Sequence, residues 1–150
     1  MINPQITISE LSDTDFGSYV EYCSILKQLT SINIENITMQ SFSHRIQMIR
    51  SNPFHQIFIA KFEGKIIGTT TVLIEPKIIH DLSFVAHIED VVVDSESRTK
   101  GIGTSLMLHA IAYAKDHCCY KIILDCSDKN VSFYEKLGFD VKEKHMAMYI

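Results

Sequence analysis

The seven residues Arg98-Thr99-Lys100-Gly101-Ile102-Gly103-Thr104 follow an apolar run that ends at Val93 and precede a segment with helical periodicity. Glycine lets the backbone approach a phosphate closely, and the free N–H groups at the start of a helix point towards an anion. Arg98 and Lys100 add positive charge beside these groups. The stretch therefore predicts a phosphate-binding turn between a strand and a helix. The alternative is a basic turn whose glycines serve only tight packing.

Two nucleotide-binding motifs do not fit this stretch. The dinucleotide pattern G-x-G-x-x-G would need glycine where the sequence has Leu106. A Walker A loop would end in Gly-Lys-Ser/Thr, whereas Gly103 is followed by Thr104. The turn is therefore assigned to neither class of nucleotide-binding protein.

The segments on either side have the periodicities of a strand and a helix. Phe84–Val93 is predicted as a long apolar strand carrying Glu89 and Asp90, and a helix is predicted from about Lys100 to Cys118. Adjacent residues of a regular strand face opposite sides, so Glu89 and Asp90 share one pocket only if a β-bulge lies near them. The apolar stripe of the helix comprises Ile102, Leu106, Met107, Ala110, Ile111, Ala114 and Cys118.

The rest of the chain predicts a mixed, mostly antiparallel α/β sheet flanked by helices, in the order β-α-α-β-β-β-α-β-α-β. Strands are expected at Gln5–Ser9, Gln56–Phe62, Lys65–Ile74, Lys121–Asp125 (short and buried) and Phe139–Tyr149, with a hairpin turn at Glu63-Gly64 and a loop at Glu75–Ser83. Helices are expected from Ser12 or Asp13 to about Thr30, from Ser41 as the capping residue to Asn52-Pro53, and at Asn130–Leu137 before Gly138. Buried faces are expected at Phe16, Tyr19, Val20, Cys23 and Leu26 in the first helix and at Phe42, Ile46 and Ile49 in the second.

Composition restricts the classes of function. A length of 150 residues fits one domain, residues 1–150. The net charge of −4 argues against a nucleic-acid binder, and no apolar run is long enough for a membrane span. Four cysteines form no C-x-x-C pair, so we expect small buried thiols in a reducing cytoplasm and no metal site. No secretory signal is expected at the start.

A second cluster begins at Asn130. Asn130 and Tyr134 are four residues apart and hence share a helix face, and Phe133 and Leu137 fit a partly buried helix. A phenol has an ordinary pKa near 10, so a tyrosine could protonate a departing thiolate, whose ordinary pKa is about 8.5. The alternative is a helix with purely structural side chains.

The two motifs in this order resemble the GNAT superfamily of acetyl-CoA-dependent N-acetyltransferases. Its Arg/Gln-x-x-Gly-x-Gly/Ala motif is matched by Arg98, Gly101 and Gly103, and its Asn-x-x-x-x-Tyr-x-x-x-Gly-Phe pattern is similar to Asn130–Phe139. The resemblance implies acetyl-CoA as cosubstrate, without a metal. It implies cofactor contacts at Val91, Val92, Val93, Arg98, Thr99, Lys100, Gly101, Ile102, Gly103, Thr104, Asn130 and Tyr134.

Within the superfamily, four stretches resemble the glucosamine-6-phosphate N-acetyltransferases, which lead towards UDP-N-acetylglucosamine: His87–Val93, Cys119–Cys126, Lys77–His80 and Leu26–Thr30. The resemblance implies a homodimer whose substrate site uses both subunits. It implies substrate contacts at Thr30, Lys77, Ile78, Ile79, His80, Glu89, Asp90, Tyr120, Lys121 and Asp125. One departure is visible, because that family has an arginine near the end of its last strand and Met146–Ile150 contains none.

These residues predict direct acetyl transfer to an amine. Tyr134 would be the general acid, Asp125 would orient the amine, Glu89 is a further catalytic candidate, and a backbone N–H of Val91 or Val92 would stabilise the oxyanion. A covalent route through Cys126 lacks an identifiable histidine partner. The open alternatives are acetylation of another small amine, such as a polyamine or an antibiotic, and a non-catalytic acetyl-CoA-binding domain. Protein-lysine acetylation is a further, less favoured alternative.

Overall fold

The computed structural model describes residues 6–150 and contains a five-stranded sheet of order β1-β2-β3-β4-β5. Neighbouring strands from β1 to β4 are antiparallel, and β5 runs parallel to β4. The strands are β1 Ile6–Glu10, β2 His55–Phe62, β3 Lys65–Pro76, β4 Phe84–Val93 and β5 Cys119–Ile123. The helices are α1 Tyr19–Leu26, α2 Met39–Arg50, α3 Ile79–Leu82, α4 Ile102–Asp116 and α5 Val131–Glu135, with 3₁₀ turns at Asp13–Ser18, Ile34–Asn36, Ser95–Ser97 and Asp128–Asn130.

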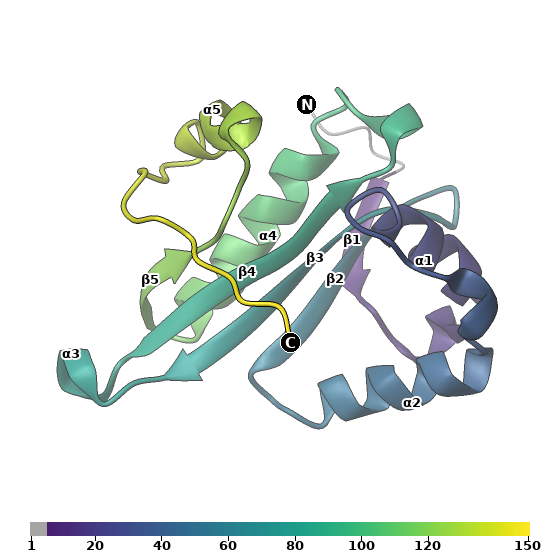
Figure 1. The fold of residues 1–150 in the computed structure, drawn as a ribbon, viewed down its shortest axis with the longest axis horizontal. Coiled ribbons are helices and arrows are strands. Elements are labelled where there is room, and N and C mark those ends of the chain that lie inside the picture. Colours follow the sequence, from purple (N-terminus) through teal and green to yellow (C-terminus); the bar gives the residue numbers. More distant parts are fainter. Residues whose placement is uncertain (1–5) are drawn as a thin grey trace.

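Helices cover both faces of the sheet. Helix α4 lies on one face, while α1 and α2 cover part of the other, which we call the α1/α2 face (Figure 1). The core under α4 is centred on Phe58, Val72, Ala86, Ile88, Leu106, Met107 and Ala110. The second core holds Leu11, Tyr22, Ile25, Phe42, Ile46, Ile57 and Ile59. The predicted α/β class and the hairpin at Glu63-Gly64 are therefore confirmed.

The contact between α4 and the sheet depends on a glycine in β3. A Cβ atom added at Gly68 would lie 3.1 Å from Leu106 Cδ1 and 3.1 Å from the Val92 carbonyl oxygen. Few real Cβ atoms approach other atoms so closely. The absence of a side chain at this position therefore lets α4 lie directly on β3 and β4.

The N-terminal helices differ in detail from expectation. The first begins as a 3₁₀ turn, and its α-helical part ends at Leu26. It buries Tyr22, Cys23 and Ile25, whereas Val20 is 48% exposed and was wrongly assigned to the buried face. The N-cap of α2 is Thr38 and not Ser41, because the Ser41 N–H donates to Thr38 Oγ1 (3.0 Å) from the third helical position. Gln5 of the predicted first strand lies outside the described residues.

The C-terminal part contains the largest corrections. The predicted strand Phe139–Tyr149 is absent, and residues 140–150 are exposed. This tail crosses in front of β4 (Figure 1). Strand β5 is therefore the edge of the sheet among residues 6–150 and is largely exposed, whereas it was expected to be buried. A strand requires a pairing partner, and residues 6–150 of a single chain give the tail none.

Three shorter segments near this end also differ. Helix α4 ends at Asp116, so Cys118 leaves the apolar stripe and is exposed, as is Cys126, while Cys23 is buried. The expected loop at Glu75–Ser83 is shorter, because β3 continues to Pro76. Within α3 the residues His80, Asp81 and Leu82 have left-handed φ values of 54°, 58° and 63°.

Candidate active site

A β-bulge in β4 brings two acidic residues to one side of the sheet. The register with β3 shifts from Thr71↔Glu89 to Thr69↔Val92, and Asp90 has a left-handed φ of 51°. Beyond the bulge Val91 and Val93 pack with the α4 core, while Val92 packs on the α1/α2 face. The alternation of faces is therefore offset by one residue, which is the condition for Glu89 and Asp90 to share a pocket.

Asp90 faces the same side as α1 and the start of β2. Burial raises the pKa of Tyr22 to about 12, and the charge of Asp90 adds to this rise. Burial lowers the pKa of the His55 imidazole, and the Asp90 carboxylate opposes that change. Both effects require Asp90 to lie within electrostatic reach of the α1/α2 face.

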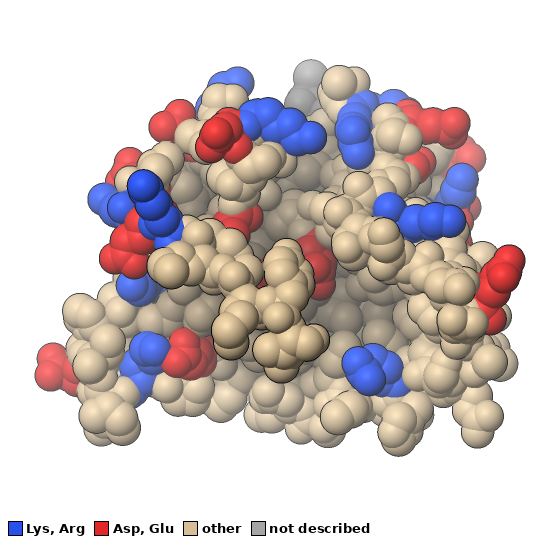
Figure 2. All heavy atoms as spheres, viewed as in Figure 1, with Lys and Arg blue, Asp and Glu red and all other residues tan. Residues whose placement is uncertain are grey.

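Three carboxylates gather on this face, namely Glu89, Asp90 and Asp125. Burial raises the pKa of Glu89, and the nearby charges of Asp90 and Asp125 raise it further. Asp125 follows β5 and pairs through Oδ2 with Nδ1 of His145 at 2.8 Å. Figure 2, which looks onto this face, shows a hollow with acidic side chains inside it. Such a cluster can accept hydrogen bonds from an amine and from hydroxyl groups.

The edge of β4 next to this cluster is open. Strand β5 pairs with β4 only from Phe84 to His87, and beyond Ile123 the two strands separate. On that side, residues 88–93 of β4 have no neighbouring strand within the described chain. Their backbone N–H and C=O groups can therefore pair with an extended ligand in the manner of an added strand.

The glycine-rich turn lies between β4 and α4. Gly101 caps α4 with a left-handed φ of 75°, and no side chain caps the helix, so its first N–H groups are free for an anion. The side chain of Ile102 is buried in the core, which leaves only its backbone N–H for a ligand. Thr99, Lys100 and Thr104 are exposed around this turn.

Gln28, from the turn after α1, organises this region, and sequence reasoning assigned it no role. Its Oε1 accepts hydrogen bonds from the Ser95 N–H (3.0 Å) and from Arg98 Nη2 (3.3 Å), and its Nε2 donates to Asp94 (2.9 Å). Arg98 Nε also donates to the Val93 carbonyl (3.2 Å). The guanidinium of Arg98 therefore fixes the turn to the end of β4, and only its remaining N–H groups are available to a ligand.

Tyr134 lies on α5 and is buried against the α4 core. Burial raises the pKa of its phenol, and Cys126 adds to the shift, so the hydroxyl retains its proton at neutral pH. Helix α5 starts after Asn130 and is held near the glycine-rich turn, because a Cβ atom at Gly103 would lie 3.5 Å from the Phe133 ring. An alanine at position 103 would therefore make ordinary van der Waals contact with this ring.

The remaining expected substrate residues form a separate group at the other end of β4. Lys77 Nζ pairs with Glu75 at 2.6 Å, His80 stacks on Tyr120 (ring centroids 4.1 Å apart), and Lys121 lies over the same ring. Lys121 pairs in register with Val85, roughly 13 Å along the strand from Glu89.

The single chain therefore does not place this second group in one pocket with the carboxylates. Ile78 and Ile79 are 83% and 60% exposed at the tip of this end. Thr30 is exposed in the turn after α1.

Comparison with known proteins places this geometry in a family. Residues 22–139 match the Acetyltransferase (GNAT) family. The chain belongs to this family. A glucosamine 6-phosphate N-acetyltransferase of Arabidopsis thaliana is 38% identical over 143 residues, covering 93% of this chain and 92% of the relative, and a Candida albicans enzyme of the same name is 34% identical, covering 93% of each.

Solved structures agree with this assignment. The crystal structure of the Arabidopsis thaliana glucosamine-6-phosphate N-acetyltransferase superposes with a TM-score of 0.90 at 37% identity, over 96% of this chain and 97% of that one. The predicted GNAT membership is thus confirmed. In residues 6–150 of this GNAT protein, no helix has the length and apolarity needed to cross a membrane, and no group of three or more His, Cys, Asp or Glu residues is arranged to hold a metal.

Proposed function

We propose that the chain, acting as a single domain, transfers the acetyl group of acetyl-CoA to the 2-amine of glucosamine 6-phosphate. The observation that carries the proposal is the carboxylate cluster of Glu89, Asp90 and Asp125 beside the open edge of β4. This arrangement places acceptors for an amine and hydroxyl groups next to a backbone edge suited to an extended thioester. The names of the relatives from plants and fungi support the choice of substrate.

The residues present fit acetyl-CoA. Residues 98–104 offer free N–H groups, Gly101 at positive φ and the cations Arg98 and Lys100 to a pyrophosphate, while residues 91–93 offer backbone groups to an extended arm. Tyr134 on α5 shares a core cluster with Val91 and Val93, and Asn130 directly precedes that helix. When bound, the cosubstrate supplies an activated acetyl group.

The side chains then position the amine and supply a proton. Asp125 accepts a hydrogen bond from the amine and holds it in a reactive orientation, and Glu89 and Asp90 accept from the sugar. A backbone N–H of Val91 or Val92 donates to the developing oxyanion. The amine attacks as the neutral base, and the proton that it loses on forming the amide passes to the Glu89 carboxylate, whose raised pKa suits this role. The Tyr134 hydroxyl, protonated at neutral pH, donates a proton to the leaving thiolate and regains one from solvent after the thiol has left. The amine is itself the nucleophile, so no enzyme-bound acyl group is required.

The active unit is proposed to be a homodimer with a shared substrate site. Lys77, His80, Tyr120 and Lys121 form a group of their own at the other end of β4, with Lys121 in register with Val85, roughly 13 Å along the strand from Glu89. In a dimer they could complete the site of the other subunit. The tail supports association, because Met146, Met148 and Tyr149 are 90%, 86% and 96% exposed.

Identification of the product tests this function. The protein is incubated with acetyl-CoA and glucosamine 6-phosphate, and separately with polyamines and aminoglycosides, and products are analysed by mass spectrometry. N-acetylglucosamine 6-phosphate is the expected product, with no acetylated product from the other amines. Acetylation of a polyamine or an aminoglycoside but not of the sugar phosphate would refute the proposal.

A further inference from the structure

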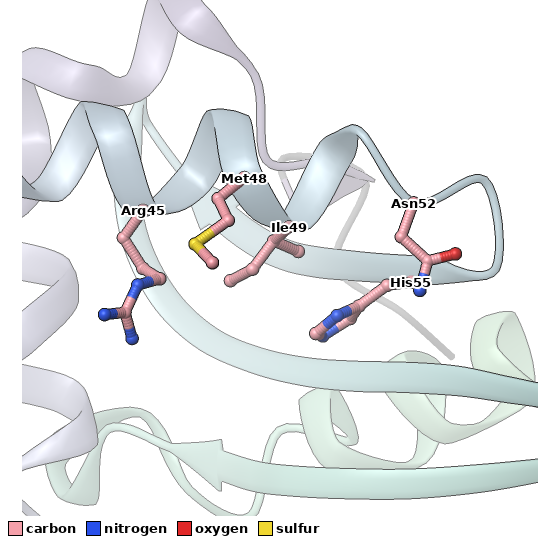
Figure 3. Close-up of a pocket in the computed structure, with 5 residues that line it drawn as sticks. All are labelled: Arg45, Met48, Ile49, Asn52 and His55. Atoms are coloured by element: carbon pink, nitrogen blue, oxygen red, sulfur yellow. The ribbon is translucent and has the colours of Figure 1, made fainter.

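Two hollows border the α1/α2 face. The first, a pocket of about 390 Å³ between α2 and the start of β2, is lined by Arg45, Met48, Ile49, Asn52 and His55 (Figure 3). Its one side-chain hydrogen bond among residues 6–150 is local, from the Phe54 N–H to Asn52 Oδ1 (3.0 Å). The second, of about 570 Å³, lies beside α1 and includes Gln28 and Asp94 in its lining. Here hydrogen bonds connect the hollow to the glycine-rich turn.

The amide of Gln28 lies between two opposite charges. Its Nε2 donates to the Asp94 carboxylate (2.9 Å), and its Oε1 accepts from Arg98 Nη2 (3.3 Å) and from the Ser95 N–H (3.0 Å). The Asp94 carboxylate and the Arg98 guanidinium are therefore one amide group apart. Within the described chain they nevertheless form no ion pair with each other. Gln28 thus gives each charged group a hydrogen-bond partner without adding a charge of its own.

Without this amide, Asp94 and Arg98 would be free to meet. They are four residues apart in sequence, with the 3₁₀ turn Ser95–Ser97 between them. The backbone of Asp94 is held in place, because its N–H donates to the Ile67 carbonyl (2.9 Å). A guanidinium and a carboxylate within reach form a strong charge-assisted pair, often with two hydrogen bonds. Such a pair would neutralise Arg98 and direct its N–H groups towards Asp94 and away from a bound anion.

We propose that Gln28 is a positioning residue for the cosubstrate, which separates Arg98 from Asp94 and so keeps the guanidinium charge available to the pyrophosphate of acetyl-CoA. This inference rests on the proposed function, because it assumes that the pyrophosphate binds at residues 98–104. A carboxylate at position 28 would accept from the same N–H groups but would neutralise Arg98 and repel Asp94. An amide accepts and donates without charge, and position 28 therefore requires glutamine.

Calorimetric titration of CoA into the protein tests this role without any sugar. Gln28→Glu keeps the length of the side chain and its acceptor for Ser95 and Arg98, and it adds a negative charge. We expect the Kd for CoA to rise about 10-fold, as for the loss of one charge-assisted hydrogen bond. Gln40→Glu makes the same change at an exposed position of α2 and should bind CoA within about twofold of the wild type. Wild-type affinity in Gln28→Glu would overturn the inference.

A double variant separates capture of Arg98 by Asp94 from simple loss of a contact. Gln28→Met removes the amide and keeps a long side chain, so the Kd for CoA should again rise about 10-fold. Asp94→Asn can still accept from Gln28 Nε2 and should alone change the Kd by no more than about twofold. Added to Gln28→Met, it should restore the Kd to within about threefold of the wild type. A loss in Gln28→Met that Asp94→Asn does not relieve would overturn the proposed separation.

A shortened thioester tests whether the effect is specific to the pyrophosphate. S-acetylpantetheine has the same thioester as acetyl-CoA but no pyrophosphate. The ratio of kcat/KM for acetyl-CoA to kcat/KM for S-acetylpantetheine should fall about 10-fold in Gln28→Met, through the KM for acetyl-CoA. Equal losses with both thioesters would contradict the inference. Because the calorimetry contains no amine, its result stands even if glucosamine 6-phosphate is not acetylated, so failure of the proposed substrate and failure of this inference are distinguishable.

Discussion

At the scale of single residues, the raised pKa of Glu89 reports the negative charge gathered at the candidate site. Its pKa is raised by burial and by the neighbouring carboxylates Asp90 and Asp125, with partial relief from His87 and His145. The cluster is thus a concentration of negative charge that a cationic amine would relieve. The repulsion among these carboxylates should therefore lower the free energy of unfolding of the substrate-free protein, and this effect can be measured.

Replacement of Glu89 by glutamine should stabilise the free protein at neutral pH. With a raised pKa, the folded protein binds this proton more tightly than the unfolded chain. The contribution of Glu89 to stability is therefore fully present below the ordinary pKa of 4.5 and is lost as the pH rises through the raised value. Because solvent screens the site, we expect a gain below about 1 kcal/mol, or at most about 4 °C in Tm, at pH 7. Thermal melts at pH 7 and pH 4 measure it; a destabilised variant at pH 7 would contradict the interpretation.

Replacement of Tyr134 by phenylalanine tests its role as proton donor. The variant keeps the buried ring and removes only the hydroxyl, so we expect kcat to fall by about 100-fold with little change in Tm. Tyr19→Phe, which alters a hydroxyl on α1 far from α5 in sequence, is the matched control. Equal kcat values for Tyr134→Phe and the wild type would remove Tyr134 from the mechanism.

At the scale of elements, strand β4 was well predicted and its surroundings were not. Its bounds follow from an apolar run, and the turn at residues 98–104 follows from glycine and charge. The bulge was only a condition for Glu89 and Asp90 to share a pocket, which the structure meets. Gln28 and the pocket at Arg45 and His55 could not be found in this way. They join segments far apart in sequence, and their residue types occur on any polar surface.

The packing of α4 on the sheet predicts the effect of a substitution at Gly68. An alanine there would place its Cβ 3.1 Å from a backbone carbonyl that cannot move without disturbing the ladder. Overpacking of this kind destabilises by about 1–3 kcal/mol, or roughly 2–4 °C in Tm for each kcal/mol. Gly17→Ala, which meets no atom within 4 Å, is the control and should melt within about 2 °C of the wild type. A Gly68→Ala variant as stable as the control would show that α4 is less closely packed than described.

At the scale of the whole molecule, the expected last strand is absent and the C-terminal tail has no strand to pair with among residues 6–150. A strand was expected at Phe139–Tyr149, yet the isolated chain leaves residues 140–150 exposed. Strand formation requires a partner edge as well as a suitable pattern, and pattern alone does not reveal which chain supplies the edge. In the same way, the residue pattern does not reveal whether the expected substrate residues belong to one site of a single chain. In the structure they form two groups, one at the carboxylates and one at the other end of β4.

A homodimer is the expected state in solution. Analytical ultracentrifugation should give the mass of two chains, and deletion of residues 140–150 should yield a monomer. The deletion leaves both cores intact, because every residue removed is exposed. A full-length monomer that is active on its substrate would contradict the shared site.

The central claim, that this chain acetylates a phosphorylated amino sugar on its α1/α2 face, is tested most directly by thiol-release kinetics. Initial rates are measured with acetyl-CoA and either glucosamine 6-phosphate or glucosamine, using the full-length wild type. The account predicts a kcat/KM about 10- to 100-fold higher for the phosphorylated sugar, the factor expected when a charged phosphate contact is lost. Equal kcat/KM values for the two sugars, or no thiol release with either, would contradict it.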